Sequence, residues 1–228
     1  MAQNLKIASR RTSVDLVFDH LYGEIVSMRL LPGTKISEVE IASLFDISRQ
    51  PVRDAFSRLA NMDLLLIRPQ KATEVKRFSF KAITTARFVR AAVEAEALRR
   101  AARECNNEGT ALLESALAVQ KIAVDTNDRD QFRSLDYAFH KTICKVGAVE
   151  FAFDVIEQEK AKADRLCVLG LDARDERLDQ LLEDHESIAK GISDNDEESA
   201  VKAGMLHLSR LDTTIENIRK EHADYFYD

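Results

Sequence analysis

The sequence predicts a mainly α protein in two parts, a small N-terminal unit of helices with one β-hairpin and a C-terminal all-α antiparallel bundle of about six helices. Three observations predict this fold class. The first third reads helix, helix, turn, helix and hairpin. The remainder has helical periodicity that only short polar breaks interrupt. Only 7 Gly and 3 Pro occur among 228 residues, so little interrupts long helices.

The N-terminal unit is expected at residues 13–78, after a flexible polar arm at residues 1–12. Apolar residues first recur at helical spacing at the start of this unit, and Pro32 and Gly33 stop the helix that they predict. The arm has no such periodicity. It is therefore left out of the predicted core.

Two further helices and a hairpin complete this unit. A second helix is expected from Ser37, where S-E-V-E offers a capping box. A third begins after the turn FDIS, with Ser48 as its cap and Pro51 in its first turn. Two short β-like runs, Leu64–Ile67 and Thr73–Val75, form a hairpin around a polar tip. This order of elements is that of a winged helix-turn-helix.

The C-terminal part, residues 79–228, is expected to be helical throughout. Short polar breaks such as NNEG and SDND separate its segments, and short connections imply antiparallel neighbours. The helices are expected at about residues 80–105, 109–125, 128–146, 149–168, 175–192 and 195–221.

Charge and composition narrow the possible functions. Residues 1–79 hold 12 Lys and Arg against 9 Asp and Glu, whereas residues 80–228 hold 21 against 30, so only the first third suits a polyanionic partner. The N-terminus lacks the apolar core of a signal peptide, and no stretch approaches a membrane span. The cysteines form no C-x-x-C pair. We therefore expect a cytoplasmic protein with no membrane partner.

The third predicted helix carries the candidate DNA-binding residues. In a helix-turn-helix, the N-terminal end of this helix faces base edges in the major groove. Arg49 and Arg53 lie there one turn apart, and Arg binds guanine through two hydrogen bonds. Ser48 and Gln50 can hold phosphate, and Lys71 at the hairpin tip can touch the backbone or minor groove. A solvated surface helix is the alternative, but the surrounding topology favours double-stranded DNA as partner.

Four polar residues interrupt apolar stripes in the bundle. Asp136 and His140, in SLDYAFHKT, are one helical turn apart on an inward face, and His185 and His207 lie on apolar faces of two other helices. Burying a polar group without a partner costs about 1–3 kcal/mol. We name these four residues the Asp–His cluster. A divalent metal would satisfy all of them, with zinc the first choice and nickel, manganese or iron as alternatives. An internal hydrogen-bond network is the competing interpretation.

The stretch ISEVEIASLFDISRQPVRDAFSRLANMDLLLIRPQKATEV resembles the winged-helix domain of GntR-type bacterial transcription regulators, whose signature is S-R-x-P-V-R-[ED]-A-[LF]-x-R-L. Two positions depart from that pattern. Val39 stands where family members often carry Arg, and Lys71-Ala72 stands in place of the usual wing-tip glycine. The resemblance implies a DNA-binding transcription regulator.

Arg90 and Glu94, followed by the spacing of the Asp–His cluster, resemble the FCD ligand-sensing domain of the FadR subfamily. Together with the winged helix, this resemblance covers about residues 13–222. A bundle of six helices is more similar to the VanR-type branch of the subfamily than to the seven-helix FadR branch. It implies a metal on the Asp and three His, with a small carboxylic or sugar acid beside it. Arg90 can pair with Glu94 or with that acid, and Arg165 is a second candidate for the acid.

These observations predict a ligand-responsive transcription regulator, a repressor rather than an enzyme. A homodimer would place two recognition helices about 34 Å apart on a short inverted repeat. Two other regulatory readings stay open, in which the metal itself is the signal or the cluster is only structural. A metal-dependent hydrolase is a poor fit because no H-E-x-x-H motif occurs, and because Asp184 and Glu186 are expected to point away from the face of His185.

Overall fold

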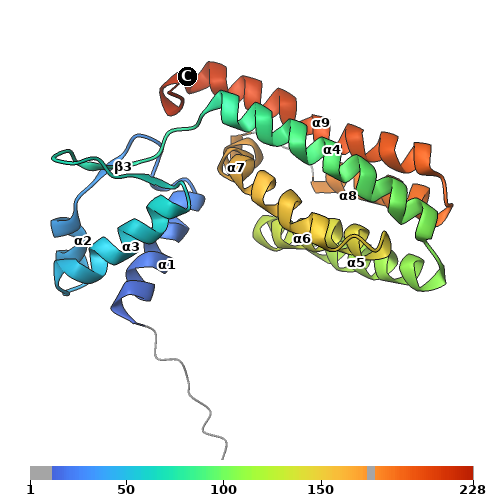
Figure 1. The fold of residues 1–228 in the computed structure, drawn as a ribbon, viewed down its shortest axis with the longest axis horizontal. Helices are drawn as coiled ribbons and strands as arrows, with labels where there is room; N and C mark the ends of the chain where they lie inside the picture. The colour runs from blue at the N-terminus through green and yellow to red at the C-terminus, as the bar shows by residue number, and fades with distance from the viewer. Residues whose placement is uncertain (1–11, 174–177, 228) are drawn as a thin grey trace, which may run out of the picture. The chain divides into compact units, whose positions relative to one another are not determined.

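The computed structural model describes residues 12–173 and 178–227, apart from the side chains at 161, 164 and 167–173. The arm predicted at residues 1–12 lies outside this range except for Thr12. The chain divides into two compact units, one ending at Phe78 and one running from Ser79 to Ala223. The mainly α fold class is confirmed (Figure 1).

The N-terminal unit contains helices and a small sheet. Its described elements, in chain order, are α1 (Ser13–Val26), β1 (Lys35–Ile36), α2 (Glu38–Leu44), α3 (Arg49–Asn61), β2 (Leu65–Leu66) and β3 (Thr73–Val75). The predicted hairpin is present as β2 and β3, and the antiparallel sheet has the order β1-β3-β2. β1 was not predicted because two residues are too short for a periodic signal. The sheet nonetheless completes the winged helix-turn-helix.

Apolar faces of the three N-terminal helices form the core of this unit. Leu21 and Ile25 of α1 and Val52, Phe56 and Leu59 of α3 are each at most 1% exposed. The hydrophobic cluster also includes residues of all three strands. Burial of these side chains holds α3 firmly while its first turn stays at the surface.

Residues Asp224–Tyr227 belong to the N-terminal unit, although the predicted bundle range included them. The Phe78 amide donates to the Tyr225 carbonyl at 2.8 Å, and the Tyr227 amide donates to the Phe78 carbonyl at 3.2 Å. The rings of Phe78 and Phe226 also pack, with centroids 5.5 Å apart. These contacts follow the end of the last helix and have no periodic signature, so the sequence did not indicate them.

The second unit is a bundle of six helices in the part of the chain that the structure describes. They are α4 (Phe80–Glu104), α5 (Asn107–Asp125), α6 (Arg129–Val146), α7 (Phe151–Ala173), α8 (Leu178–Ser193) and α9 (Glu197–Glu221). Helix α4 packs along α7 and α9, α5 along α6 and α8, and α8 along α9, and Figure 1 shows α4 beside α9 and α5 beside α6. Helix α7 continues five residues past its predicted end at 168.

The polar breaks between these helices act as caps. The side chains of Ser79, Asn106, Asp128 and Asp196 each accept a hydrogen bond from a backbone N–H in the first turn of the next helix. Inside the bundle, Leu98, Phe139, Ile188 and Ile192 are at most 1% exposed. Among the described helices, none combines the length and apolar character needed to cross a membrane.

Candidate metal centre and DNA-binding surface

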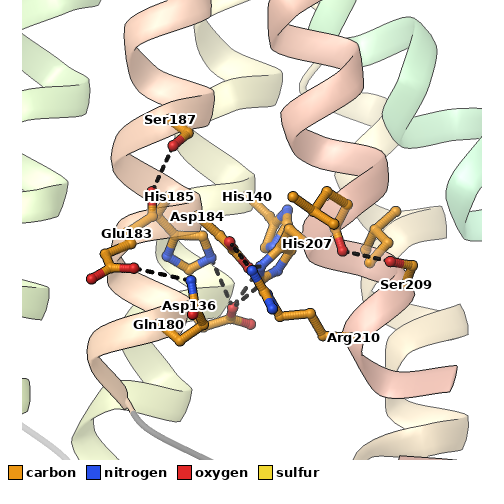
Figure 2. Close-up of polar contacts among 12 residues, drawn as sticks. Asp136, His140, Gln180, Glu183, Asp184, His185, Ser187, His207, Ser209 and Arg210 are labelled. Atoms are coloured by element: carbon orange, nitrogen blue, oxygen red, sulfur yellow. Dashed lines mark hydrogen bonds and ion pairs between the residues drawn. The ribbon is translucent and has the colours of Figure 1, made fainter. Parts of the chain in front are cut away.

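The structure brings the four residues of the Asp–His cluster together inside the bundle. Asp136 and His140 come from α6, His185 from α8 and His207 from α9, and one ligand atom from each lies within 4.8 Å of the others. The Nε2 atoms of His140, His185 and His207 lie 3.8, 3.3 and 3.9 Å from the same oxygen, Oδ1 of Asp136. Figure 2 shows imidazoles of separate helices turned toward this carboxylate.

The outer nitrogen of each imidazole faces a separate acceptor. The three Nδ1 contacts are His140 with Glu94 Oε2 at 2.7 Å, His185 with Gln120 Oε1 at 2.7 Å, and His207 with Asp184 Oδ2 at 3.6 Å. Hydrogen-bonded outer partners like those of His140 and His185 fix the orientation of metal-binding imidazoles and direct Nε2 inward. The 3.6 Å contact of His207 is longer than a hydrogen bond, and its Nδ1 has no hydrogen-bond partner among the described residues.

Gln120 determines which nitrogen of His185 carries the proton. The Gln120 amide nitrogen donates to the Leu135 carbonyl at 3.1 Å, so Oε1 is the atom that faces His185. An oxygen acceptor requires that His185 Nδ1 be the donor. In the neutral imidazole, Nε2 is then a lone pair directed at a carboxylate oxygen 3.3 Å away. Two acceptors face each other there with no proton between them.

Burial favours the neutral form of His185 and His207. It lowers the pKa of His185 and of His207, and the facing carboxylates Asp136 and Asp184 only partly oppose this effect. Burial also acts to raise the pKa of Asp136. Lys160 and the imidazoles nevertheless hold that pKa well below its usual range, and the Nζ of Lys160 lies 3.0 Å from Asp136 Oδ2. Two neutral imidazoles beside an ionised carboxylate are in the protonation state that a divalent metal requires of its ligands.

The donor set fits a divalent ion. His185 is fully buried, and its Nε2 has no hydrogen-bond partner in the described part of the chain. Ligand atoms about 2.1 Å from an ion lie at most about 4.2 Å apart. The observed spread of 4.8 Å therefore has to close by only a fraction of an ångström on each side. Three imidazoles and one carboxylate suit zinc and the other first-row metals.

A cavity of about 100 Å³ borders the cluster at Asp136 and His207. Four cationic side chains line it, and its other lining residues are apolar. The cations are Arg90, Arg133, Lys160 and Arg210, and the apolar residues are Phe132, Leu181, Leu208 and Leu211.

Arg90 pairs with Glu94 and also lines the cavity. Its Nε lies 2.5 Å from Glu94 Oε1. Arg165 is buried on α7, but it is not among the described residues that line the cavity. Of the two arginines, Arg90 is therefore the one that lines the cavity in the described part of the chain.

Asp184 corrects one expectation. It was expected to point away from the site, but it is buried, faces His207 and accepts a 2.7 Å hydrogen bond from Arg210 Nη2. Although burial acts to raise it, the pKa of Asp184 is held at about 2 by His207 and Arg210. The spacing along α8 alone identifies the face that carries His185. Helix α9 packs beside α8 and also meets the adjacent face, which carries Asp184.

The candidate DNA-binding residues lie at the exposed start of α3. Arg49 and Arg53 are about half exposed, and both bind Oε2 of Glu38 on α2, at 2.8 and 2.9 Å. Gln50 donates to the side chain of Asp54 at 3.0 Å. Both arginines lower the pKa of Glu38, and their effect together exceeds the opposing effect of burial. This carboxylate therefore stays charged. Two guanidinium groups are thus held side by side at the end of the helix that reads DNA in this fold.

Two further candidates flank that helix. Ser48 occupies the N-cap position of α3, but its hydroxyl makes no capping hydrogen bond, contrary to the predicted cap. Its extended backbone leaves the hydroxyl at the surface beside the first free N–H groups, where phosphate can bind. Lys71 is exposed between β2 and β3, at the tip of the wing.

Comparisons with known proteins agree with this architecture. Residues 14–75 match the family described as bacterial regulatory proteins, gntR family, and residues 86–210 match the FCD domain. The chain is 33% identical over 210 residues to the HTH-type transcriptional repressor RspR of Escherichia coli (strain K12), covering 92% of each chain. It is 29% identical over 204 residues to the probable D-xylose utilization operon transcriptional repressor of Paenarthrobacter nicotinovorans, covering 90% of this chain and 89% of the relative.

Solved structures support the same fold. The chain resembles E. coli McbR/YncC with a TM-score of 0.68 at 18% sequence identity, covering 90% of this chain and 98% of that one. The family is defined by the gntR match followed by the FCD match, and by the similarity to RspR over nearly the whole length of both chains. The chain therefore belongs to the gntR family of bacterial regulatory proteins, with a C-terminal FCD domain, and is a DNA-binding transcription regulator rather than an enzyme.

Proposed function

We propose that this regulator is a repressor that holds a divalent metal in the Asp–His cluster and releases its operator when a small organic acid binds beside the metal. Zinc is the first choice of metal, and sugar acids are one candidate class of effector. The unprotonated Nε2 of His185, directed at the Asp136 carboxylate, carries the proposal because a cation between them removes the repulsion.

The cavity supplies the features that an acid needs. A bound ion would contribute positive charge and Lewis acidity at the wall formed by Asp136 and His207. Arg90 lines the same cavity and can donate two hydrogen bonds to a carboxylate. A change of 10- to 100-fold in operator affinity requires about 1.4–2.8 kcal/mol of coupling between the two sites.

The DNA-binding part of the proposal rests on Ser48, Arg49, Gln50, Arg53 and Lys71. Two copies would bind a short inverted repeat, since paired helix-turn-helix units read half-sites one helical turn apart. Two relatives named as repressors support repression. Binding to chromosomal DNA would place the protein in the cytoplasm.

Metal analysis and a thermal-shift assay of the full chain test this function. The operator is first selected from a random DNA library, and its affinity is measured by fluorescence anisotropy. We expect one metal per chain, and we expect at least one of gluconate, glucarate, malate and lactate to raise the melting temperature only in metal-loaded protein. The same acid should weaken operator binding 10- to 100-fold.

Other outcomes favour the remaining interpretations. A steep change of operator affinity with metal alone would make the metal the signal. No metal after dialysis, with no loss of stability on adding chelator, would mean that the cluster is only structural. The His185→Ala variant should lose the metal and the acid response together, whereas Lys121→Gln, an exposed change on α5, should keep both.

A further inference from the structure

We propose that the effector is a short diacid and that Arg133 receives its second anionic group. This inference rests on the proposed function, because it concerns the chemistry of the acid that binds beside the metal. It assigns a specificity-determining role to a residue outside the metal cluster.

The charge balance of the cavity supports two negative charges on the ligand. Each of the four lining cations forms an ion pair with a carboxylate. The pairs are Arg90 with Glu94, Arg133 with Asp130, Lys160 with Asp136, and Arg210 with Asp184. Among the described lining residues, Asp136 is the one carboxylate beside these four cations. A divalent ion would add two positive charges to that wall, and a dianion balances them better than a monoanion does.

Arg133 differs from the other three cations in its partner. Glu94, Asp136 and Asp184 are buried carboxylates, whereas the side chain of Asp130 is 91% exposed. An exposed ion pair contributes little, typically 0–1 kcal/mol. The Nε of Arg133 is also buried and has no hydrogen-bond partner among the described residues. Arg133 thus lines the cavity while its ion pair is with an exposed carboxylate rather than a buried one.

The position of Arg133 limits the length of the diacid. Arg133 precedes Asp136 by three residues on α6, so their side chains are neighbours on one face, with Cβ atoms about 5–6 Å apart. One carboxylate beside the metal ligand and another at Arg133 would be separated by a short carbon chain. The cavity of about 100 Å³ agrees, since it is well below the 300–1,000 Å³ of pockets that hold drug-sized ligands.

Matched pairs of acids test the inference. Glucarate and gluconate differ only in whether the sixth carbon is a carboxylate or an alcohol. Malate and 3-hydroxybutyrate differ only in whether one terminal carbon is a carboxylate or a methyl group. Binding to zinc-loaded full-length protein is measured by isothermal titration calorimetry in a buffer without phosphate or carboxylate. We expect the diacid of at least one pair to bind ten or more times more tightly than its monoacid.

Variants at position 133 locate the effect. Arg133→Gln should weaken diacid binding about tenfold and leave monoacid binding within twofold, and Arg133→Lys should restore part of the preference. The Lys121→Gln control removes an exposed charge on α5 and should change neither. Metal content and melting temperature of each variant check that the bundle is intact.

Three results would overturn the inference. Equal binding of diacid and monoacid in both pairs contradicts it while leaving the proposed function in place. Equal losses for both acids in Arg133→Gln contradict the role of Arg133. No binding of any of these acids to zinc-loaded protein contradicts the proposed function as well.

Discussion

Replacing Gln120 by Leu should weaken metal binding although Gln120 is not a ligand. Gln120 is fully buried, and its Oε1 accepts the Nδ1 proton of His185 at 2.7 Å. Without this acceptor, the favourable tautomer places the proton on Nε2, which lies 3.3 Å from Asp136 Oδ1 and can donate to it. The proton would then occupy the atom that the metal needs.

The magnitude follows from the loss of one outer partner. Mutation of such partners lowers metal affinity about 10- to 100-fold, which corresponds to about 1.4–2.8 kcal/mol. The metal-free variant should also lose about 1–3 kcal/mol of unfolding free energy, because the buried Nδ1 of His185 loses its hydrogen-bond partner. Metal affinity is measured by competition with a chelator, and nitrogen NMR of the imidazoles reports the tautomer of His185.

Two controls accompany this variant. Gln120→Glu keeps an oxygen acceptor and should bind metal more tightly than Gln120→Leu. Gln180→Leu makes the same substitution on α8 at a residue whose side chain donates to Glu183, and metal affinity should not change. Unchanged metal affinity in Gln120→Leu, with the proton still on Nδ1, would refute the reasoning.

Three further predictions concern packing, DNA and pH. Gly191→Ala should destabilise the bundle by about 1–3 kcal/mol, because an added Cβ would lie 2.6 Å from a backbone nitrogen of α9. Gly23→Ala should not destabilise the protein, because an added Cβ there meets nothing within 4 Å. Equal unfolding free energies of the two variants in urea would contradict this prediction. Arg53→Gln should weaken operator binding by about 1–3 kcal/mol in anisotropy titrations, and an unchanged affinity would remove Arg53 from the DNA contacts. Because the pKa values of His185 and His207 are lowered, the unfolded state binds more protons than the folded state below about pH 6.5. The unfolding free energy of metal-free protein should therefore fall as the pH falls below that value. A rise of the unfolding free energy would contradict the burial argument.

Most of the fold could be predicted because its elements carry periodic or capping signals. Long amphipathic helices bounded by Ser79 or Asp196 follow from local physics. The missed elements lack such signals. Strand β1 has two residues, and the contact of Phe226 with Phe78 joins segments at opposite ends of the sequence.

The inward faces of the cluster could also be predicted, but its contacts across helices could not. His185 interrupts an apolar stripe, and so do Gln120 on α5 and Lys160 on α7. The same argument therefore could have found those two residues. Which helices meet, and at what rotation, decides that Gln120 faces His185 and that Asp184 faces His207. Those relations depend on tertiary packing and leave no mark in a single helix.

X-ray absorption spectroscopy of the metal-loaded protein tests the central claim most directly. We predict an ion bound by three imidazole nitrogens and one carboxylate oxygen of each chain, and no bound ion in His185→Ala. An ion without imidazole scattering, or an ion that His185→Ala binds with an unchanged spectrum, would contradict the claim that these helices converge on one metal.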